Sequence, residues 1–400
     1  MFILIVASGY PTPKYGGNGI FEFDQAKALA QAGCKVVYAA VDLRSLRRWR
    51  KWGCEHFYND GVEVYAVNIP LGRVPHPVIK RAGRTGLKYL YRRIMKDHGE
   101  PDVVHAHFFA PAEIALALKS LVSKSKFVMT EHSSLIAGAY ELYPEWLKKC
   151  ATQVYEAYEA VICVSSSLAE TIKARFNIDA DVIPNMIDPV FLTATDCGKS
   201  YAHSNTFRFV FVGNLIDGKR PKQCIQSFYK AFCEHHFSTE DGRNIVLELI
   251  GNGSLFSECE HLIAELGIGK NVTLHGFQTR DKIVEIFRQS DCFVLPSKLE
   301  TFGVAYIEAM ACGLPVIATR CGGPESFVNE DNGVLIPVDE EGALIGAFRE
   351  MAANIDRYNK KKIASMASDN FSPEAIADKL VDVYTSLLKN CNNTGLNNGR

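Results

Sequence analysis

Short runs of apolar residues alternate with helical stretches along this chain, and that alternation constrains the fold more than any other feature. Phe2–Ala7, Val36–Ala40 and Val161–Val164 are apolar at every position. Strands of this kind are buried on both faces, as they are in a parallel sheet that helices cover. The same series continues at Val62–Val67, Val103-Val104 and Phe127–Thr130. The chain is therefore predicted to adopt an α/β fold.

The alternation starts again after residue 206, which predicts a second domain. Strands are expected at Phe207–Val212, Val246–Ile250, Val272–His275, Cys292–Leu295 and Pro315–Thr319, with helices between them. The prolines of segment 183–189 suit a crossing between the two series. We predict two doubly wound, Rossmann-like domains, residues 1–188 and 189–371, that face a central cleft.

The C-terminal part of the chain is expected to hold one helix and a tail. Ser372 is a capping residue, and Pro373 suits the first helical position. A helix over 372–389 is expected to return to the N-terminal domain. The polar residues 390–400 are expected to be disordered.

Composition excludes several classes of protein. The 400 residues include 44 basic and 45 acidic ones, a formal net charge of −1, which argues against a dedicated nucleic-acid binder. No apolar run approaches the ~20 residues that a membrane-spanning helix needs, and the opening MFILIVASG lacks the basic start of a signal peptide. Twelve cysteines without a CxxC pair indicate reduced thiols. We expect a cytoplasmic protein.

A glycine-rich loop follows the first predicted strand. Gly16, Gly17 and the next Asn-Gly lead into a helix over Phe21–Ala32, where bare backbone N–H groups suit a phosphate. A glycine turn without a ligand fits these residues equally well. The loop is not the dinucleotide fingerprint, because Glu22 occupies the third glycine position.

Histidines follow two predicted strands of the first domain. His132 follows Phe127–Thr130, and a structural and a functional role are equally open for it. His105 and His107 come directly after Val103-Val104, and a structural role is the simpler interpretation for them.

The second domain carries charged residues at its strand ends. Lys219 and Arg220 follow the first strand and its Gly213-Asn214 turn. They could hold a diphosphate, although a solvated basic turn fits equally well. Gly251-Asn252-Gly253 ends the next strand and is explained as well by a plain turn.

Two glutamates bracket the most informative segment. Glu300 precedes a helix predicted over Val304–Ala311, and Glu308 is expected two turns inside that helix. Both carboxylates are expected to point to the same end of the sheet, where they would accept hydroxyl groups of a polyhydroxy ligand such as sugar and ribose. Free N–H groups near Gly303 could meet an anion.

These segments occur in the same order as in one enzyme family. They are Gly213-Asn214-Leu215 with Lys219, Gly251-Asn252-Gly253, His275-Gly276-Phe277, Glu300-x7-Glu308, Ala311–Ala318 and Gly322-Gly323-Pro324-Glu325. Together with Gly16-Gly17 and Pro184–Asp188, this order resembles the retaining GT-B glycosyltransferases of family four (glycosyl transferases group 1). The resemblance covers nearly the whole chain and is strongest over 207–336. It implies the two-domain GT-B fold.

The resemblance also implies roles. Lys219 would neutralise the donor diphosphate, Glu300 would hold hydroxyls of the donor sugar, and Glu308 would hold the ribose. Gly17 would pack against the diphosphate, and His132 would contact the transferred sugar. The expected site comprises catalytic His132, Lys219 and Glu300, and donor-binding Gly16, Gly17, Asn214, Lys219, Arg220, Gly276, Phe277, Glu300, Phe302, Gly303, Val304 and Glu308.

One position departs from the family pattern. The family usually has an arginine where Asn214 stands, so one positive charge is missing. Either Arg220 supplies it, or phosphate binding depends more on backbone amides.

The implied activity is transfer of a sugar from a nucleotide-diphosphate sugar, UDP- or GDP-linked, to a saccharide or lipid-linked acceptor with retention of configuration. Cell-surface polysaccharide or glycolipid assembly would be its setting. No metal is expected, since Asp179-Ala180-Asp181 lies far in sequence from the donor motifs. An epimerase of the same fold and a non-catalytic nucleotide-sugar binding protein are the alternatives.

Charge is concentrated in one segment. Residues 44–96 hold thirteen basic and three acidic residues, a net charge of +10. Leu87, Leu90, Tyr91 and Ile94 lie near helical spacing among the bases, a pattern that favours an anionic membrane surface. We expect peripheral attachment at the inner face of the plasma membrane. A solvated basic face, or a pocket for an anionic soluble acceptor, is the alternative.

Overall fold

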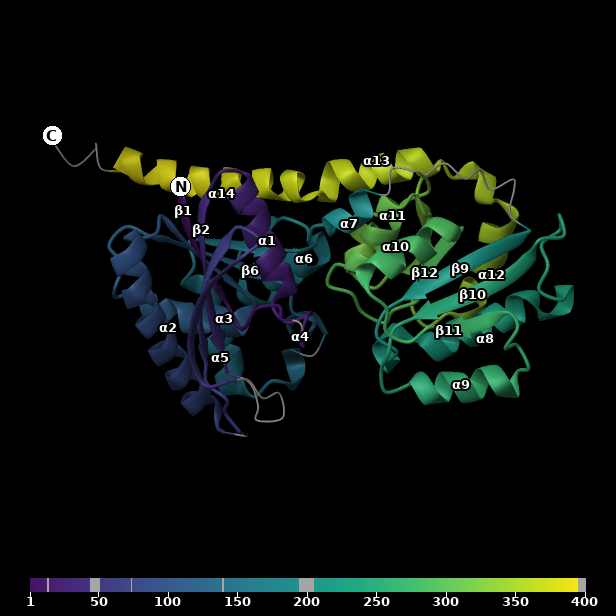
Figure 1. Ribbon diagram of the computed structural model, residues 1–400, viewed down its shortest axis with the longest axis horizontal. Helices are drawn as coiled ribbons and strands as arrows, with labels where there is room; N and C mark the ends of the chain where they lie inside the picture. The colour runs from purple at the N-terminus through teal and green to yellow at the C-terminus, as the bar shows by residue number, and fades with distance from the viewer. Residues whose placement is uncertain (13, 44–50, 73, 139, 194–204, 395–400) are drawn as a thin grey trace. The chain divides into compact units, whose positions relative to one another are not determined.

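The computed structural model describes residues 1–12, 14–43, 51–72, 74–138, 140–193 and 205–394. The chain forms two compact units. The first is formed by Met1–Met186 together with the chain from Pro373 onward, and the second by Ile187–Ser372. Each unit holds one sheet with helices against it (Figure 1). The predicted α/β fold is confirmed.

The first unit contains a sheet of eight described strands in the order β3-β4-β2-β1-β5-β6-β7-β8. The strands are β1 (Phe2–Ala7), β2 (Lys35–Asp42), β3 (Gly53–Asn59), β4 (Val62–Asn68), β5 (Val103–His107), β6 (Lys126–Glu131), β7 (Ala160–Cys163) and β8 (Asp181–Val182). The helices are α1 (Ile20–Gln31), α2 (His76–His98), α3 (Phe109–Ala115), α4 (Ser134–Gly138), α5 (Glu145–Glu156), α6 (Ser166–Phe176) and α14 (Pro373–Thr394). Parallel neighbours on both sides of β1, namely β2 and β5, make its carboxyl end a topological switch point.

One edge of this sheet differs from the all-parallel prediction. Strand β3 pairs antiparallel with β4, and the two are joined by Asp60 and Gly61. These residues have φ values of 48° and 81°, as a two-residue hairpin turn requires. Most of β3 is exposed, so it lacks the apolar pattern by which the buried strands are recognised.

Helices cover both faces of the first sheet. Helix α1 packs on β1 and β2 and is accompanied by α14, while α2 and α3 contact the other face (Figure 1). Val78 and Tyr89 of α2 are exposed, but the four apolar residues that the sequence places in a stripe, Leu87, Leu90, Tyr91 and Ile94, are buried. They are therefore core residues, and their interpretation as a membrane-facing stripe was wrong.

The C-terminal helix belongs to the first unit. Helix α14 begins at Pro373, directly after Ser372. Ile376, Leu380 and Tyr384 are buried in the same core as residues of α1 and the sheet. The helix continues to Thr394, so the expectation of a disordered tail from residue 390 was wrong for 390–394. Residues 395–400 lie outside the described part of the chain.

The second unit contains a parallel sheet of six described strands in the order β11-β10-β9-β12-β13-β14. The strands are β9 (Thr206–Val212), β10 (Asn244–Ile250), β11 (Val272–Leu274), β12 (Cys292–Leu295), β13 (Val316–Thr319) and β14 (Gly333–Ile336). The helices are α7 (Pro189–Leu192), α8 (Pro221–Phe232), α9 (Phe256–Glu265), α10 (Arg280–Gln289), α11 (Val304–Ala311), α12 (Glu341–Ala353) and α13 (Lys360–Phe371). Strand β9 lies between β10 and β12, which makes its carboxyl end the switch point of this sheet.

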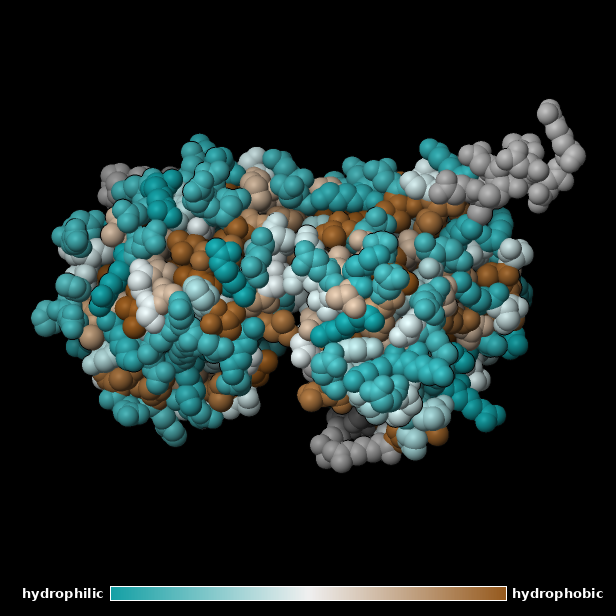
Figure 2. All heavy atoms as spheres, turned by 180° about the vertical axis from the view of Figure 1, so that it is seen from behind, coloured by the Kyte–Doolittle hydropathy of each residue, from teal (hydrophilic) through white to brown (hydrophobic). Residues whose placement is uncertain are grey.

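The surface and the thiols agree with the composition. On the face drawn in Figure 2, hydrophilic side chains cover most of the surface and hydrophobic patches between them are small. Among the described helices, none combines the length and apolar character needed to cross a membrane. The ten cysteines whose side chains the structure describes are free thiols, and six of them are buried.

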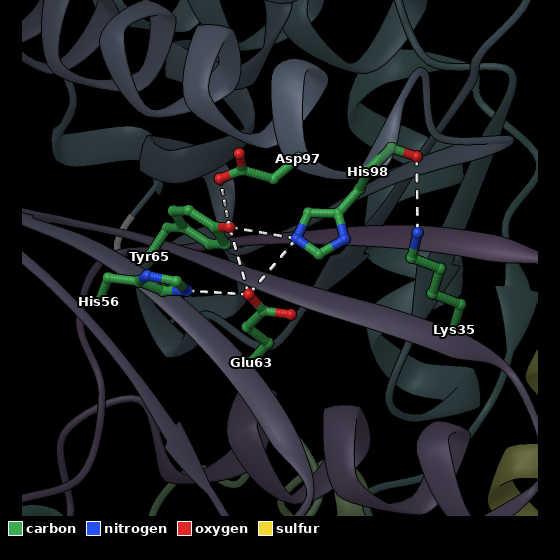
Figure 3. Close-up of polar contacts among 6 residues, drawn as sticks. All are labelled: Lys35, His56, Glu63, Tyr65, Asp97 and His98. Atoms are coloured by element: carbon green, nitrogen blue, oxygen red, sulfur yellow. Dashed lines mark hydrogen bonds and ion pairs between the residues drawn. The ribbon is translucent and has the colours of Figure 1, made fainter.

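A polar cluster ties the antiparallel hairpin to α2 (Figure 3). Glu63 Oε1 lies 2.8 Å from His56 Nε2, 3.2 Å from the Tyr65 hydroxyl and 3.4 Å from His98 Nε2. The Tyr65 hydroxyl also lies 2.9 Å from Asp97 Oδ2. Burial by itself would raise the pKa of the Glu63 carboxyl, but the hydrogen bond from His56, further hydrogen bonds and the charge of His98 together lower it.

A lowered pKa in the folded chain makes Glu63 a source of pH-dependent stability. The contribution is present above the ordinary carboxyl pKa of 4.5 and is lost as the pH falls through the lower, folded value. We expect Glu63→Gln to destabilise the first unit by about 1 kcal/mol at pH 7. At acid pH, thermal unfolding should no longer distinguish it from the wild type.

Glu156→Gln is the control, because Glu156 is exposed on α5. It should melt like the wild type at both pH values. A Glu63→Gln defect of equal size at pH 7 and at acid pH would show that the carboxylate charge is not what stabilises the hairpin.

Candidate active site

A cavity of about 300 Å³ opens at the carboxyl edge of the second sheet. Its lining comes from the ends of β9, β10 and β12 and from the first turn of α11, so it stands at the switch point of the sheet. The lining residues are Val212, Gly213, Asn214, Lys219, Ile250, Gly251, Phe277, Gln278, Ile283, Leu295, Glu300, Gly303, Val304 and Ala305. Six of the residues predicted from the sequence are among them: Asn214, Lys219, Phe277, Glu300, Gly303 and Val304.

Two strand-end loops meet there backbone to backbone. A Cβ atom on Gly251, whose φ is 140°, would lie 1.9 Å from the carbonyl oxygen of Gly213, and one on Gly253 would lie 2.4 Å from that of Leu215. The Leu215 amide donates to the Asn252 carbonyl at 3.0 Å. No side chain fits between these loops, so the glycines are required for the approach that holds Asn214 at the cavity.

An ion pair lies inside the cavity. Lys219 Nζ contacts Glu300 Oε1, and the Ser297 hydroxyl donates to the same oxygen at 2.7 Å. The Glu300 side chain is 9% exposed and that of Lys219 is 25% exposed. The turn that carries Lys219 is attached to the next loop, because the Lys298 amide donates to the Gly218 carbonyl at 2.8 Å. The carboxylate is thus compensated, and the ammonium group can still be reached by a ligand.

The first turn of α11 presents backbone amides to the cavity. Gly303 precedes the helix with a φ of 98°, and a Cβ atom there would lie 2.6 Å from the Tyr306 ring. The first amides of a helix lack partners within it, and Val304 and Ala305 line the cavity. Glu308 is the fifth residue of α11, about one turn inside rather than the two expected, and it does not line the cavity with Glu300.

Three predicted residues have other surroundings. Phe302 is buried, and its ring packs against Phe327 at 5.1 Å, so only its backbone is available to a ligand. Arg220 is 7% exposed, and its guanidinium pairs with Asp339. Arg220 does not line the cavity. In this arrangement it therefore does not supply the positive charge that is expected at position 214. The Gly276 carbonyl accepts the Gly251 amide at 2.9 Å.

In the first unit, three buried histidines stand in a row at the carboxyl edge of the sheet. The rings of His105 and His107 are 4.4 Å apart, and His107 Nδ1 lies 3.1 Å from His132 Nε2. At the other end of the row, His105 Nδ1 lies 2.6 Å from the hydroxyl of Tyr384 in α14, and its Nε2 lies 2.8 Å from Thr130 Oγ1. A residue on the last helix thereby supports the row that ends at His132.

These histidines are uncharged at neutral pH. Burial lowers the pKa of His132 to about 4, against a smaller opposing effect of a hydrogen bond with Asn185. Burial and the neighbouring His132 lower the pKa of His105 to about 3. The pKa of His107 is also well below its ordinary value, first because of burial. His132 can therefore offer a hydrogen bond to a ligand but not a full positive charge.

The glycine loop also belongs to the first unit. Gly16 and Gly17 are exposed between β1 and α1. A Cβ atom on Gly17 would meet nothing within 4 Å, whereas one on Gly19 would lie 2.5 Å from the Gly9 carbonyl oxygen. Packing within the chain therefore requires glycine at 19 and not at 17.

Two family models divide the chain between them. The one described as Glycosyltransferase Family 4 matches residues 15–191, and the one described as Glycosyl transferases group 1 matches residues 198–386. The chain belongs to the group 1 glycosyltransferases.

Known proteins resemble this glycosyltransferase over almost its full length. An uncharacterised glycosyltransferase of Methanocaldococcus jannaschii is 28% identical over 96% of this chain and 98% of its own. The N-acetyl-alpha-D-glucosaminyl L-malate synthase of Bacillus anthracis is 27% identical over 95% of this chain and 97% of its own. The solved sucrose-phosphate synthase of Thermosynechococcus elongatus has a TM-score of 0.74 at 20% identity, covering 97% of this chain and 99% of that one. The fold of this glycosyltransferase is GT-B.

Sequence reasoning missed several residues that shape the two sites. Ser297 ends the Leu-Pro-Ser segment before Glu300 and binds its carboxylate. Glu131 accepts the backbone amides of His132 at 3.0 Å and Ser133 at 2.8 Å and the Tyr155 hydroxyl at 2.6 Å, which fixes the loop of His132. A buried acid directly before His132 was a usable signal. Gln278 and Ile283 reach the cavity only through the tertiary fold and left no such signal.

Proposed function

We propose that this glycosyltransferase transfers a sugar from a nucleotide-diphosphate sugar to a saccharide or lipid-linked acceptor, with retention of configuration, in polysaccharide or glycolipid assembly. The observation that carries the proposal is the pairing of Lys219 with Glu300 inside the cavity at the switch point of the second sheet. A cation suits the diphosphate and a carboxylate suits the sugar hydroxyls.

Donor binding would give Lys219 and Glu300 new partners in place of each other. In the free chain Lys219 compensates Glu300, and a bound diphosphate would draw the ammonium group toward its own oxygens. Glu300, still held by Ser297, would then accept hydrogen bonds from the donor sugar. The amides at the start of α11 would meet the remaining phosphate charge. Because Lys219 and these amides neutralise the leaving group, the proposed reaction needs no metal ion.

An aromatic ring at the rim suits the base of the nucleotide. Phe277 lines the cavity and is 80% exposed, which is unusual for a side chain with no polar atom. Stacking on an aromatic face accepts either a uracil or a guanine base. We therefore assign the base end of the donor to Phe277 and the sugar end to Glu300, and UDP and GDP sugars both remain candidates.

The first unit would bind the acceptor and would add two contacts to the donor. His132 is buried and neutral, so it suits hydrogen bonding to a hydroxyl of the transferred sugar. Gly17 leaves open space where a side chain would stand, which suits close approach to a diphosphate. In the proposed reaction the bond from C1 to the phosphate oxygen breaks while the acceptor oxygen bonds to C1 on the same face. The acceptor proton passes to the leaving phosphate.

Turnover of the donor tests the proposal. Lys219→Ala and Glu300→Ala should each lower kcat/KM by roughly 10²–10³, the cost of removing a preorganised charged group at a reacting centre. Lys270→Ala is the control, because Lys270 is exposed in the same unit and does not line the cavity.

The donor class is first chosen by thermal shift with UDP, GDP and ADP, since a ligand that binds the folded state raises the melting temperature of the protein.

The products separate this function from its alternatives. Formation of the C2 epimer from UDP-N-acetylglucosamine alone would identify an epimerase. Donor binding without any turnover, in the presence of a range of saccharide and lipid-linked acceptors, would identify a binding protein. Equal turnover by wild type, Lys219→Ala and Glu300→Ala would remove the cavity from the mechanism.

The basic face of α2 is our candidate for contact with an anionic membrane. Its apolar stripe of Leu87, Leu90, Tyr91 and Ile94 is buried, while Val78 and Tyr89 are exposed. We assign the attraction mainly to charge, with Arg81, Arg92 and Lys96 exposed. Each base near an anionic surface contributes roughly 1 kcal/mol. The triple variant Arg81→Gln, Arg92→Gln, Lys96→Gln should bind anionic vesicles on the order of 10²-fold more weakly at low salt in a sedimentation assay. Residues 44–50, with four further arginines, lie outside the described residues.

The matched control removes three charges from the second unit, by Lys230→Gln, Lys270→Gln and Lys282→Gln. These lysines are all exposed, and vesicle binding should survive their loss. If both triple variants lose binding equally, the attraction is a general charge effect. If the wild type does not sediment with the vesicles at all, the membrane contact is excluded.

A further inference from the structure

A second cavity, distinct from the donor cavity, lies in the first unit at the carboxyl edge of its sheet. It has a volume of about 450 Å³. Its lining follows the ends of β1 and β4 and includes the start of β3. The lining residues are Tyr10, Thr12, Lys14, Tyr15, Lys51, Glu55, Phe57 and Asn68. None of them belongs to the set of site residues predicted from the sequence.

Hydrogen bonds join Thr12 and Tyr15 in the loop after β1. The Thr12 and Tyr15 amides and carbonyls bond reciprocally at 3.4 and 3.0 Å, and the Thr12 hydroxyl accepts the Tyr15 amide at 3.1 Å. The Gly9 carbonyl accepts the buried Tyr38 hydroxyl at 2.8 Å. Lys14 and Tyr15, which line the cavity, therefore lie beside a hydrogen-bonded pair of residues.

Neutral donors hold a carboxylate in the cavity. The Tyr10 hydroxyl donates to Glu55 Oε2, and Asn68 Nδ2 donates to the same oxygen at 3.1 Å. Tyr10 is 4% and Asn68 3% exposed, so the carboxylate is positioned by groups that cannot move away. Both donors reach Oε2, and no hydrogen bond from the described residues to the other oxygen of Glu55 is present. We assign that oxygen to a hydroxyl group of the ligand.

Aromatic rings and cations complete the lining. The rings of Tyr10 and Phe57 lie 5.3 Å apart, and Tyr15 lines the same cavity. Tyr15 and Phe57 are half-buried, and the exposed parts of their rings offer apolar faces of the kind that a sugar ring packs against. Lys14 and Lys51, both exposed, add two positive charges against the single negative charge of Glu55. The cavity thus offers a carboxylate that can accept hydroxyl groups, aromatic faces that can contact a sugar ring, and an excess of positive charge. Together these features fit a ligand that is rich in hydroxyl groups and negatively charged.

We propose that this cavity binds the acceptor, and that the acceptor is an acidic saccharide or polyol, carrying a phosphate or carboxylate that Lys14 and Lys51 bind. Glu55 and Asn68 would recognise its hydroxyl groups. The acceptor assignment rests on the proposed transferase function, whereas the binding of acidic saccharides to this cavity does not. The acidic group could belong to a soluble sugar phosphate or to the phosphate that links a saccharide to a lipid.

Binding without any nucleotide tests the proposal on the full chain. By titration calorimetry, glucose 6-phosphate and glucuronate should bind at least about tenfold more tightly than glucose. Lys14→Gln and Lys51→Gln should each remove most of that preference. Glu55→Gln should weaken glucose and glucose 6-phosphate alike, because it removes a hydroxyl acceptor common to both.

Lys124→Gln is the control for charge, because Lys124 is exposed in the same unit and does not line the cavity. It should leave the preference unchanged. A second set of binding experiments uses phosphatidylcholine vesicles that contain phosphatidylinositol. It shows whether the acidic group belongs to a soluble sugar or to a lipid-linked one. Binding of glucose 6-phosphate in solution supports a soluble acceptor, and cavity-dependent binding seen only with these vesicles supports a lipid-linked one.

The proposal is overturned if the wild type binds glucose 6-phosphate, glucuronate and glucose equally and shows no cavity-dependent binding to the vesicles, or if the Lys14 and Lys51 variants bind like the wild type. Lys219→Ala separates this failure from failure of the proposed function. It should lose the thermal shift by nucleoside diphosphate and keep its affinity for glucose 6-phosphate. Lys51→Gln should keep the thermal shift by nucleoside diphosphate and lose its affinity for glucose 6-phosphate.

Discussion

The site of the second unit depends on the ion pair between Lys219 and Glu300. A carboxylate that is nine-tenths buried needs a partner, because an unpaired buried charge is strongly unfavourable. Lys219 supplies that partner only because its turn is tied to the loop of Lys298. The donor that we propose, with phosphate for the lysine and hydroxyls for the carboxylate, would satisfy both charges again. The free chain is thus prepared for a ligand that carries both groups.

The two units provide different chemistry at equivalent places in their sheets. At the switch point of the second sheet, the ion pair of Lys219 and Glu300 and the first amides of α11 lie at a cavity whose other lining is mostly apolar. At the carboxyl edge of the first, His107 at the end of β5 and His132 directly after β6 are buried and neutral. They are supported through His105 by Tyr384 of the last helix. Charge in the first unit gathers instead around the cavity that Lys14, Lys51 and Glu55 line. This division suits a reaction between an anionic leaving group and a hydroxyl of an acceptor.

The sequence predicted those parts of the fold that follow from local pattern. Buried strands such as Phe2–Ala7 have no polar position, and their order with the helices implied two parallel sheets. Strand β3 was missed because an exposed edge strand has no such pattern, although Asp60-Gly61 is a hairpin signal. The apolar stripe of α2 was misjudged, because the sequence cannot tell a stripe that packs on a sheet from one that packs on lipid.

At the site, Lys219, Glu300 and Gly303 could be proposed from motifs, because loops at parallel strand ends converge on one edge. Arg220 could not be excluded without its partner Asp339, which is 119 residues away. The most direct test of the account is a crystal structure of the chain with the nucleoside diphosphate selected by thermal shift. The account predicts that the diphosphate lies against Lys219 and the first amides of α11, with the ion pair to Glu300 opened. A diphosphate bound elsewhere, with Lys219 and Glu300 still paired, would contradict it.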